Sequence, residues 1–352
     1  MNMNGNRREF IFGAGALGLL APLGGCRLFG GEPDSVRGVV LHVKDLTPES
    51  DWPRRAAAAG LNTIATHVFP EDVIPFLKSG NGCRFTDDCR KYGLAVEHEM
   101  HAIEYLLPRD LFEKNPELFR LDEKGVRQRK SNGCFTNPRT LEIIAERAVE
   151  LSRLCPPTTG RYYYWLSDFG PTCRCERCRR YTPAEQGVIV ENAIVSAIRR
   201  EIDPHATLSH LAYAQLMTVP EKVKPHEGLF LEFAPVNRWR RNANIYKRED
   251  LPEGCDHLAR LDALLKLFPA DTAQVLEYWL DESLYCYYKK PLKKLPWDAK
   301  RTREDVAAYR RRGIRRFTNF AVWLNAEYEK AHGCGSLACV KEYGDILKEQ
   351  GL

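Results

Sequence analysis

The chain has 352 residues, enough for one large domain or two of medium size. Hydrophobic residues make up 44% and charged residues 28%, which is ordinary for a globular protein. The formal net charge of +5 is spread along the chain, which argues against a nucleic-acid binder that neutralises phosphates. Beyond the N-terminus, no segment is apolar for long enough to span a bilayer.

Residues 1–25 have the pattern of an export signal rather than of a fold. Arg7 and Arg8 precede a weakly apolar stretch rich in Gly and Ala, which is typical of twin-arginine signals. A Leu-Gly-Gly-Cys sequence ending at Cys26 looks like a lipobox, in which that cysteine is lipidated; a plain cleaved signal is the alternative. We expect a periplasmic or cell-surface protein that meets the membrane only through a lipid at Cys26, with 26–36 as a short linker.

Residues 37–352 alternate short apolar runs with amphipathic segments. Near-continuous apolar runs are typical of parallel strands covered on both faces. Eight strands are expected, at Arg37–Val43, Thr63–Val68, Leu94–Met100, Tyr162–Leu166, Thr207–Ala212, Leu229–Phe233, Ala273–Tyr278 and Arg316–Trp323. Eight such alternations predict a single α/β domain, a (β/α)8 TIM barrel. A doubly wound open sheet is disfavoured, because no glycine-rich phosphate loop follows the first strand.

Between the strands, apolar residues at helical spacing predict helices. These are expected at Leu141–Leu154, Val188–Ile202, Leu258–Phe268 and, as a charged surface helix beginning at a Thr-x-x-Asp cap, Thr302–Arg312. The third connection, Met100–Arg139, is long for a barrel loop, as is the cysteine-containing fourth one. Long connections of this kind usually shape an active site.

Acids and aromatic residues gather where the strands end, which is the edge at which barrel enzymes place their chemistry. Asp168 follows the aromatic run Tyr162–Trp165, and partial burial there would raise its pKa. We expect Asp168 to be the general acid of a glycoside hydrolase, which needs one protonated and one ionised carboxyl group. Alternatively, Asp168 caps the next helix or accepts hydrogen bonds from the Gly170 turn.

The second carboxylate is expected to be Glu232 or Glu277, each an acid within an apolar strand. The alternative is that these acids are buried and paired with Arg or Lys. Substrate contacts are expected from aromatic side chains that stack on sugar rings and from polar groups that hold hydroxyls, namely His67, Glu99, His101, Tyr213, Tyr278, Trp279 and Trp323.

Glu97, Glu99 and His101 alternate along one strand and share one face. They favour a polar barrel interior over a metal site, because no strong metal-binding spacing accompanies them. No cofactor is expected, and a metal-dependent hydrolase stays an alternative. Basic residues after the sixth strand, Arg238 among them, form either a solvated rim or a site for an acidic sugar.

Cys173-x-Cys175-x-x-Cys178 follows Asp168 closely, and Cys134 is a possible fourth partner. In an oxidising compartment this pattern favours a disulfide to Cys134 or structural thiols. Structural zinc is the weaker alternative, since one half of the usual two-residue spacing is compressed, and a catalytic thiol is the third. Local bridges between Cys83 and Cys89 and between Cys334 and Cys339 are also possible.

Several motifs occur in a distinctive order. His101 and Pro108 are followed by Asn115–Phe119, Cys134–Pro138, Ser167-Asp168, the cysteine cluster and Leu211–Tyr213. This order resembles the bacterial family called domain of unknown function 4838, which is glycoside-hydrolase-like and akin to α-glucuronidases and β-hexosaminidases. The resemblance implies a (β/α)8 barrel over about residues 37–330, with Asp168 at the family's conspicuous strand-four acid. Unlike in hexosaminidases, Phe169 rather than Glu follows that acid.

Two functions are therefore expected. The first is an exported glycoside hydrolase with paired carboxylates at the barrel mouth, acting on an oligosaccharide or glycoside, such as an acidic sugar or one derived from a plant or host polysaccharide. The second is a non-catalytic carbohydrate-binding barrel on the cell surface, with aromatic residues at the mouth but without two carboxylates within about 10 Å of each other.

Overall fold

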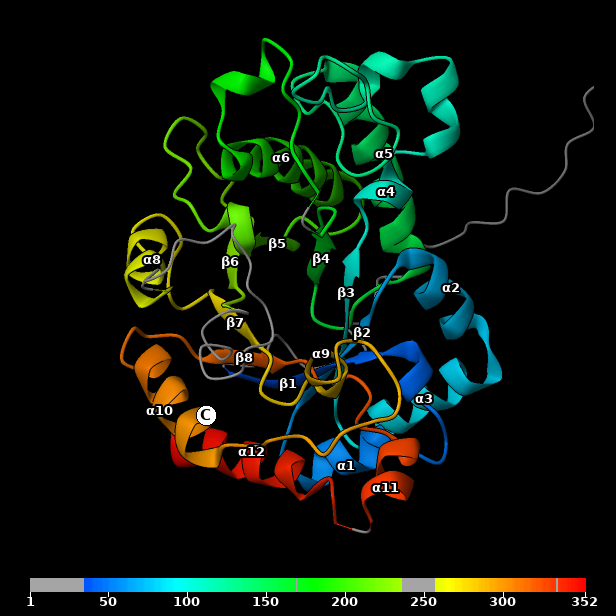
Figure 1. Ribbon diagram of the computed structural model, residues 1–352, viewed down its shortest axis with the longest axis vertical. Coiled ribbons are helices and arrows are strands. Elements are labelled where there is room, and N and C mark those ends of the chain that lie inside the picture. The colour runs from blue at the N-terminus through cyan, green and yellow to red at the C-terminus, as the bar shows by residue number, and fades with distance from the viewer. Residues whose placement is uncertain (1–34, 169, 236–256, 334) are drawn as a thin grey trace, which may run out of the picture. The chain divides into compact units, whose positions relative to one another are not determined.

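Eight parallel strands pair in chain order, and the last strand pairs with the first, so the sheet closes into a barrel (Figure 1). The computed structural model describes residues 35–168, 170–235, 257–333 and 335–352. The strands are β1 (Val36–His42), β2 (Thr63–His67), β3 (Ala95–His101), β4 (Arg161–Trp165), β5 (Thr207–Ala212), β6 (Leu229–Phe233), β7 (Gln274–Glu277) and β8 (Arg316–Asn319). The predicted (β/α)8 barrel is confirmed.

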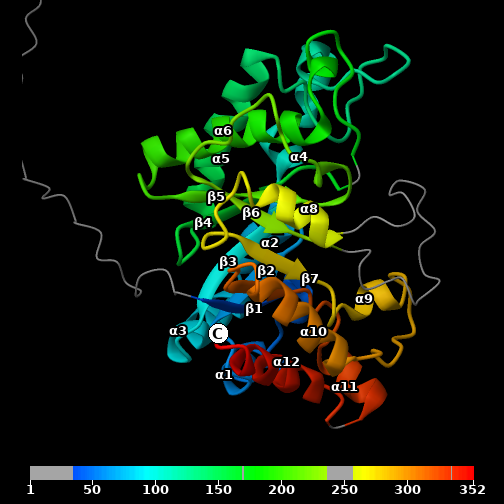
Figure 2. The ribbon, with the colours of Figure 1, turned by 90° about the vertical axis from the view of Figure 1, so that its left-hand side faces the viewer.

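Helices surround the barrel on the outside (Figure 1 and Figure 2). They are α1 (Trp52–Ala58), α2 (Pro70–Lys78), α3 (Gly80–Lys91), α4 (Ile103–Leu106), α5 (Pro138–Leu154), α6 (Pro183–Glu201), α8 (His257–Leu264), α9 (Glu282–Tyr285), α10 (Ala299–Arg310), α11 (Ala326–His332) and α12 (Ala338–Glu349). The longest two, α5 and α6, pack side by side next to β4 and β5. Within the described residues, no helix is long and apolar enough to cross a membrane.

The helix starts follow local capping chemistry. α6 begins with a capping box, in which Thr182 and Glu185 each accept a hydrogen bond from the other's backbone N–H. The predicted start of α10 at Thr302 is wrong. The helix begins at Ala299, because the Asp298 carboxylate already accepts from Arg301 N at 2.9 Å, while the buried Thr302 hydroxyl donates to Asp298 O.

The last two strands end earlier than predicted, β7 at Glu277 and β8 at Asn319. After Asn319 only single backbone bonds continue the pairing, such as Ala321 N to Val40 O at 3.0 Å, and Trp323 then turns away with φ +68°. Where β7 and β8 end determines which of the following side chains lie at the mouth of the barrel.

Candidate functional site

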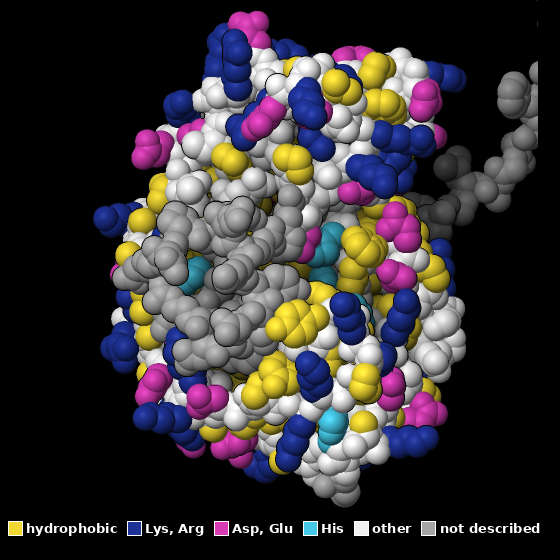
Figure 3. Space-filling view, viewed as in Figure 1, with side chains coloured by type: hydrophobic (Ala, Val, Ile, Leu, Met, Phe, Trp, Pro, Cys, Tyr) yellow, Lys and Arg dark blue, Asp and Glu magenta, His cyan; other side chains and the backbone are white. Residues whose placement is uncertain are grey.

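A cavity of about 460 Å³ lies at the C-terminal ends of the strands, which is a usual size for a small-molecule site. It is lined by His42, His67, Val68, Phe69, His101, Glu104, Ser131, Trp165, Ser167, Asp168, Leu211, Tyr213, Leu276, Tyr278, Asp281, Ser283, Leu284, Tyr288, Phe320 and Val322. In Figure 3, histidine side chains lie in a hollow with hydrophobic side chains at its edge. Five predicted site residues meet in this cavity: His67, His101, Asp168, Tyr213 and Tyr278.

Aromatic rings make up much of the cavity wall. Tyr278 packs on Phe320 with ring centroids 5.1 Å apart, and Trp165 lies 6.4 Å from the same ring. Phe69 and Tyr288 are 47% and 59% exposed, which is unusual for such large apolar groups. Flat rings that are open to a cavity can stack on the apolar faces of sugars.

Three histidines from the ends of β1, β2 and β3 form the polar part of the wall. His67 lies between His42 and His101, with ring centroids 5.5 Å from each. Burial lowers the pKa of all three, that of His42 to about 4, so the rings are neutral near pH 7. His67 Nδ1 lies 2.6 Å from Glu99 O, and His101 Nδ1 lies 3.2 Å from Leu166 O. Since a carbonyl only accepts, each Nδ1 carries the proton, and each Nε2 is an acceptor for a hydroxyl.

Three acids belong to the same wall. Asp168 lies just beyond β4 and is exposed, so the expected partial burial of its carboxyl group is wrong. Glu104 accepts from Ser167 Oγ at 2.9 Å. Asp281 is only 4% exposed, and its Oδ1 accepts from Leu284 N at 3.1 Å and from Ser283 Oγ at 2.6 Å.

Asp168 and Asp281 both affect the pKa of Tyr278, one of the aromatic residues of the cavity wall. Burial is the main cause that raises the pKa of Tyr278 well above its usual value, and negative charge at Tyr213, Asp168, Tyr288 and Asp281 raises it further. The two carboxylates therefore share the electrostatic surroundings of Tyr278, one from the end of β4 and one from the segment after β7.

Glu232 does not reach the cavity, and its predicted place at the mouth is wrong. Its side chain points into the barrel and is fully buried, and Trp165 Nε1 donates to its Oε2 at 2.8 Å. Trp165 lines the cavity while Glu232 does not, so the indole separates this carboxyl group from the cavity. Burial raises the pKa of Glu232 to about 8, which leaves it mostly protonated at neutral pH.

Glu99 is likewise buried inside the barrel and absent from the cavity wall, which corrects its predicted role in holding substrate. Burial, with the nearby Glu232 charge, raises its pKa well above the usual value. Below it, Arg161 Nε lies 3.7 Å from Glu97 Oε1, and Tyr163 Oη donates to Glu97 Oε2 at 2.8 Å. Gln274 links Glu99 to Arg161, since it accepts from Arg161 Nη2 at 3.2 Å and donates to Glu99 at 3.4 Å.

Glu277 and Trp279 face away from the cavity, so both predictions are wrong for a reason of strand geometry. Side chains alternate along β7, and because Leu276 and Tyr278 point inward, their neighbours point toward the helices. Glu277 Oε1 accepts from Tyr309 Oη on α10 at 2.5 Å. The Trp279 ring lies 6.0 Å from that of Tyr343 on α12.

Two further predicted contacts fall elsewhere. Trp323 is not part of the cavity wall, because β8 ends before it; its ring lies 4.9 Å from Lys290 Nζ. Arg238 lies outside the described residues.

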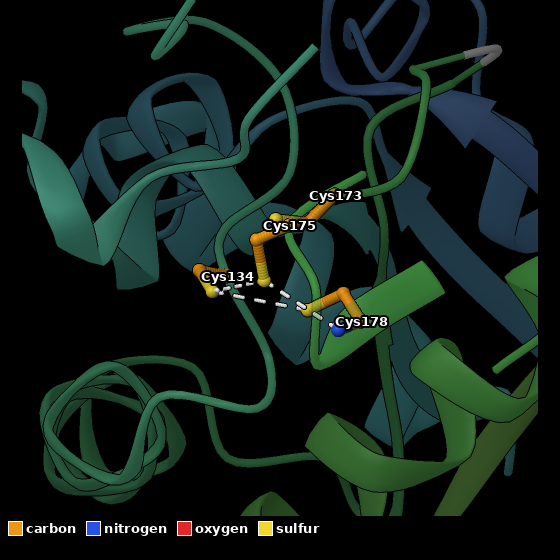
Figure 4. A group of neighbouring side chains, drawn as sticks. All are labelled: Cys134, Cys173, Cys175 and Cys178. Carbon is orange, nitrogen blue, oxygen red and sulfur yellow. Dashed lines mark hydrogen bonds between the residues drawn. The ribbon is translucent and has the colours of Figure 1, made fainter. Parts of the chain in front are cut away.

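Of the two interpretations favoured for this cluster, a disulfide to Cys134 or structural thiols, the disulfide is contradicted, since all nine described cysteines are free thiols. Instead, Cys134, Cys173, Cys175 and Cys178 point toward one another with their ligand atoms within 4.8 Å (Figure 4). Cys83 and Cys89, both on α3, are free as well, and Cys334 lies outside the described residues. In the described parts of the chain, this is the one group of His, Cys, Asp and Glu whose ligand atoms converge in this way; Glu97, Glu99 and His101 do not.

Sequence reasoning missed Asp281, Glu104, His42 and Phe320. Phe320 was missed because the predicted eighth strand ran on to Trp323, although β8 ends at Asn319. Asp281 was missed because it lies in the segment after β7, beyond the strand end where site residues were expected. The signal for Asp281 is its place in Asp281-Glu282-Ser283, a capping sequence directly after a buried strand end. The signal for His42 is its position at the end of the first strand, in line with His67 and His101.

A family model for a domain of unknown function, DUF4838, matches residues 76–258, slightly more than half of the chain. The chain belongs to this family. The matched DUF4838 region includes β3 to β6, the long third and fourth connections, Asp168 and all four clustered cysteines. A comparison with curated protein sequences gives no match.

Solved structures share the fold of this DUF4838 protein. A GH42 β-galactosidase from G. stearothermophilus aligns with TM-score 0.50 and 12% identity over 91% of this chain and 57% of its own. A β-galactosidase from the psychrophilic Marinomonas ef1 aligns with TM-score 0.52 and 12% identity over 89% of this chain and 59% of its own. The chain thus spans less than two thirds of these enzymes, and the likeness shows that it shares their (β/α)8 barrel fold.

Proposed function

We propose that this DUF4838 protein is a glycoside hydrolase that binds the end of a sugar chain in the cavity at the barrel mouth. The observation that carries the proposal is that two carboxylates, Asp168 and Asp281, line one cavity together with aromatic rings and neutral histidines. Glycoside hydrolysis needs an acid that protonates the leaving oxygen and a carboxylate that activates water or attacks the sugar carbon. It also needs flat apolar surfaces on which the sugar ring can stack.

The two acids differ in a way that suggests their roles. Asp281 is buried, and its Oδ1 accepts two hydrogen bonds that hold the carboxyl group in one orientation at the cavity, which suits a base or nucleophile. Asp168 is the candidate proton donor because of its position: it is exposed at the mouth, where a leaving group would depart. A bound sugar would shield its carboxyl group from water, which favours the protonated form. His67 and His101 would accept hydrogen bonds from sugar hydroxyls through Nε2.

The described cavity wall contains three neutral histidines and no Lys or Arg, which favours a neutral sugar in the space it encloses. Recognition of an acidic sugar would rest on Arg238 and its neighbours, outside the described residues. Residues 1–25 and Cys26 support export to the periplasm or cell surface with a lipid anchor, as part of the same proposal.

The test is hydrolysis of a panel of neutral aryl glycosides and uronic-acid oligosaccharides by wild type, Asp168→Asn and a control, Asp87→Asn. Asp87 is an exposed acid on α3 that is not part of the cavity wall, and it pairs with Arg90. We expect Asp168→Asn to lower kcat by about 10²–10⁴-fold and Asp87→Asn to leave it unchanged. Undiminished cleavage by Asp168→Asn would refute the assignment of the acid.

One observation favours the non-catalytic alternative: Asp281 Oδ1 caps α9. A binding barrel would bind members of the same panel, by calorimetry, without cleaving any of them. That result would mean that the cavity binds sugars and does not hydrolyse them.

A further inference from the structure

The four cysteines near the mouth have the geometry of a metal site. Cys134 Sγ lies 3.7 Å from Cys175 Sγ and 3.8 Å from Cys178 Sγ, and the four ligand atoms lie within 4.8 Å of one another (Figure 4). A zinc ion bound tetrahedrally by sulfur at about 2.3 Å requires sulfur atoms about 3.8 Å apart. We propose that Cys134, Cys173, Cys175 and Cys178 bind one structural zinc ion.

The surroundings of the sulfur atoms suit thiolates. Leu121 N lies 3.2 Å from Cys173 Sγ and donates to it, and Cys178 N donates to Cys175 Sγ at 3.4 Å. Hydrogen bonds to ligand atoms orient them and stabilise their charge, as is usual around metal sites. Arg120 interacts electrostatically with Cys173, and its buried Nε has no hydrogen-bond partner among the described residues. Its positive charge would offset part of the excess negative charge of four thiolates around a divalent ion.

The chemistry favours a single zinc ion over the alternatives. Sulfur atoms this close enclose room for one ion, and a tetrahedral set of four sulfurs selects zinc or iron. Zinc has no redox chemistry, so it suits a protein expected in an oxidising compartment. The twin-arginine route exports folded proteins, so the ion would be bound before export; this last point rests on the proposed export.

The site joins two connections that build the cavity. Cys134 lies in the third connection, before α5, and the other three cysteines lie in the fourth, before α6. Beside this junction the buried Asn132 donates to Gly170 O at 3.0 Å and accepts from Ser167 N at 3.1 Å. The proposed ion would therefore hold the segment that carries Ser167 and Asp168 against the one that carries Ser131.

The test is metal analysis of the full chain purified without chelator, by inductively coupled plasma mass spectrometry. We expect about one zinc per chain in wild type, and close to none in Cys134→Ser and Cys175→Ser. Cys83→Ser, which replaces an exposed thiol on α3, is the matched control and should keep its zinc. Cobalt exchanged into wild type should give the intense thiolate-to-metal absorption of a tetrahedral sulfur site.

Three outcomes would overturn the proposal: wild type without metal, iron in place of zinc, or disulfides among these cysteines in the mass spectrum. Because these measurements are made on wild type, a failure of the variants to fold does not affect them. None of them requires activity, so the zinc site and the proposed hydrolysis can fail independently.

Discussion

The mouth of the barrel and its interior both bring acids next to aromatic rings, but they use them differently. Inside, Glu97, Glu99 and Glu232 are fully buried around Arg161, the one buried Lys or Arg among the described residues. At the mouth, Asp168 is exposed, while Asp281 is buried but borders the cavity. A strongly raised pKa alone would have selected Glu232 as the catalytic acid, yet Trp165 separates it from the cavity. Access to substrate, rather than burial, distinguishes a reactive acid from a structural one.

The largest effect is expected at the mouth, from Asp281→Asn. Asparagine is also a good helix cap, so α9 should form, while the charge needed for attack or for activating water is lost. We expect kcat to fall by about 10²–10⁴-fold with little change in the free energy of unfolding. Steady-state kinetics on a cleaved glycoside and chemical denaturation measure the two quantities. An unchanged kcat would show that Asp281 takes no part in the reaction.

A large effect on stability is expected in the interior, from Arg161→Met. This change leaves Glu97 without its cation, and breaking a buried pair typically costs about 3–5 kcal/mol. The control is Arg303→Met, which removes a surface pair with Glu349 and should cost less than about 1 kcal/mol. Urea denaturation compares them. Equal costs for the two variants would contradict the view that the interior depends on its one cation.

An effect of comparable size, visible as a pH dependence, is expected from Glu232→Gln. The pKa of Glu232 is raised to about 8 in the folded protein, above the 4.5 of an ordinary glutamic acid. Its favourable contribution is therefore complete below about pH 4.5 and is lost as pH rises toward 8, by roughly 1.4 kcal/mol per pH unit. The pKa of His42 is lowered to about 4, so this residue makes the free energy of unfolding fall as pH drops below about 6.5. His42 is present in both proteins, so its effect cancels in their difference.

The difference in unfolding free energy between wild type and Glu232→Gln should therefore shift in favour of the variant from pH 5 to pH 8. Denaturation at several pH values measures it. A constant difference would mean that Glu232 is ionised in the folded barrel.

The smallest effect is expected from Glu277→Gln, which faces α10 rather than the cavity. Glutamine keeps an oxygen to accept from Tyr309 Oη, so the hydrogen bond can remain. We expect kcat and KM for a cleaved glycoside to stay within about twofold of wild type. A loss comparable to that of Asp281→Asn would show that β7 presents the opposite face to the cavity.

The barrel could be predicted because each strand is a short apolar run, and because parallel strands need helices between them. The residues at the mouth were harder to predict. A shift of one residue along a strand reverses the direction of a side chain, which is why Tyr278 lies in the cavity wall while its neighbours Glu277 and Trp279 do not. His67 and His101 were predictable because the ends of β2 and β3 were placed within one residue.

Other site features depend on contacts that no sequence pattern contains. Trp165 covers Glu232 because the side chains of β4 and β6 that point into the barrel meet there, although the two strands are not neighbours in the sheet. The approach of Cys134 to the other three cysteines requires two long connections to fold against each other, so the spacing alone, which favoured a disulfide or structural thiols over zinc, could not decide between them.

The bridge made by Asn132 between the third and fourth connections has a consequence for how new specificities arise. A chimera that took residues 102–137 from a relative and kept 166–182 would lose the hydrogen bonds of Asn132 to Ser167 and Gly170 wherever the relative lacks this asparagine. The two connections are therefore exchanged most safely together, while the strands beneath are kept.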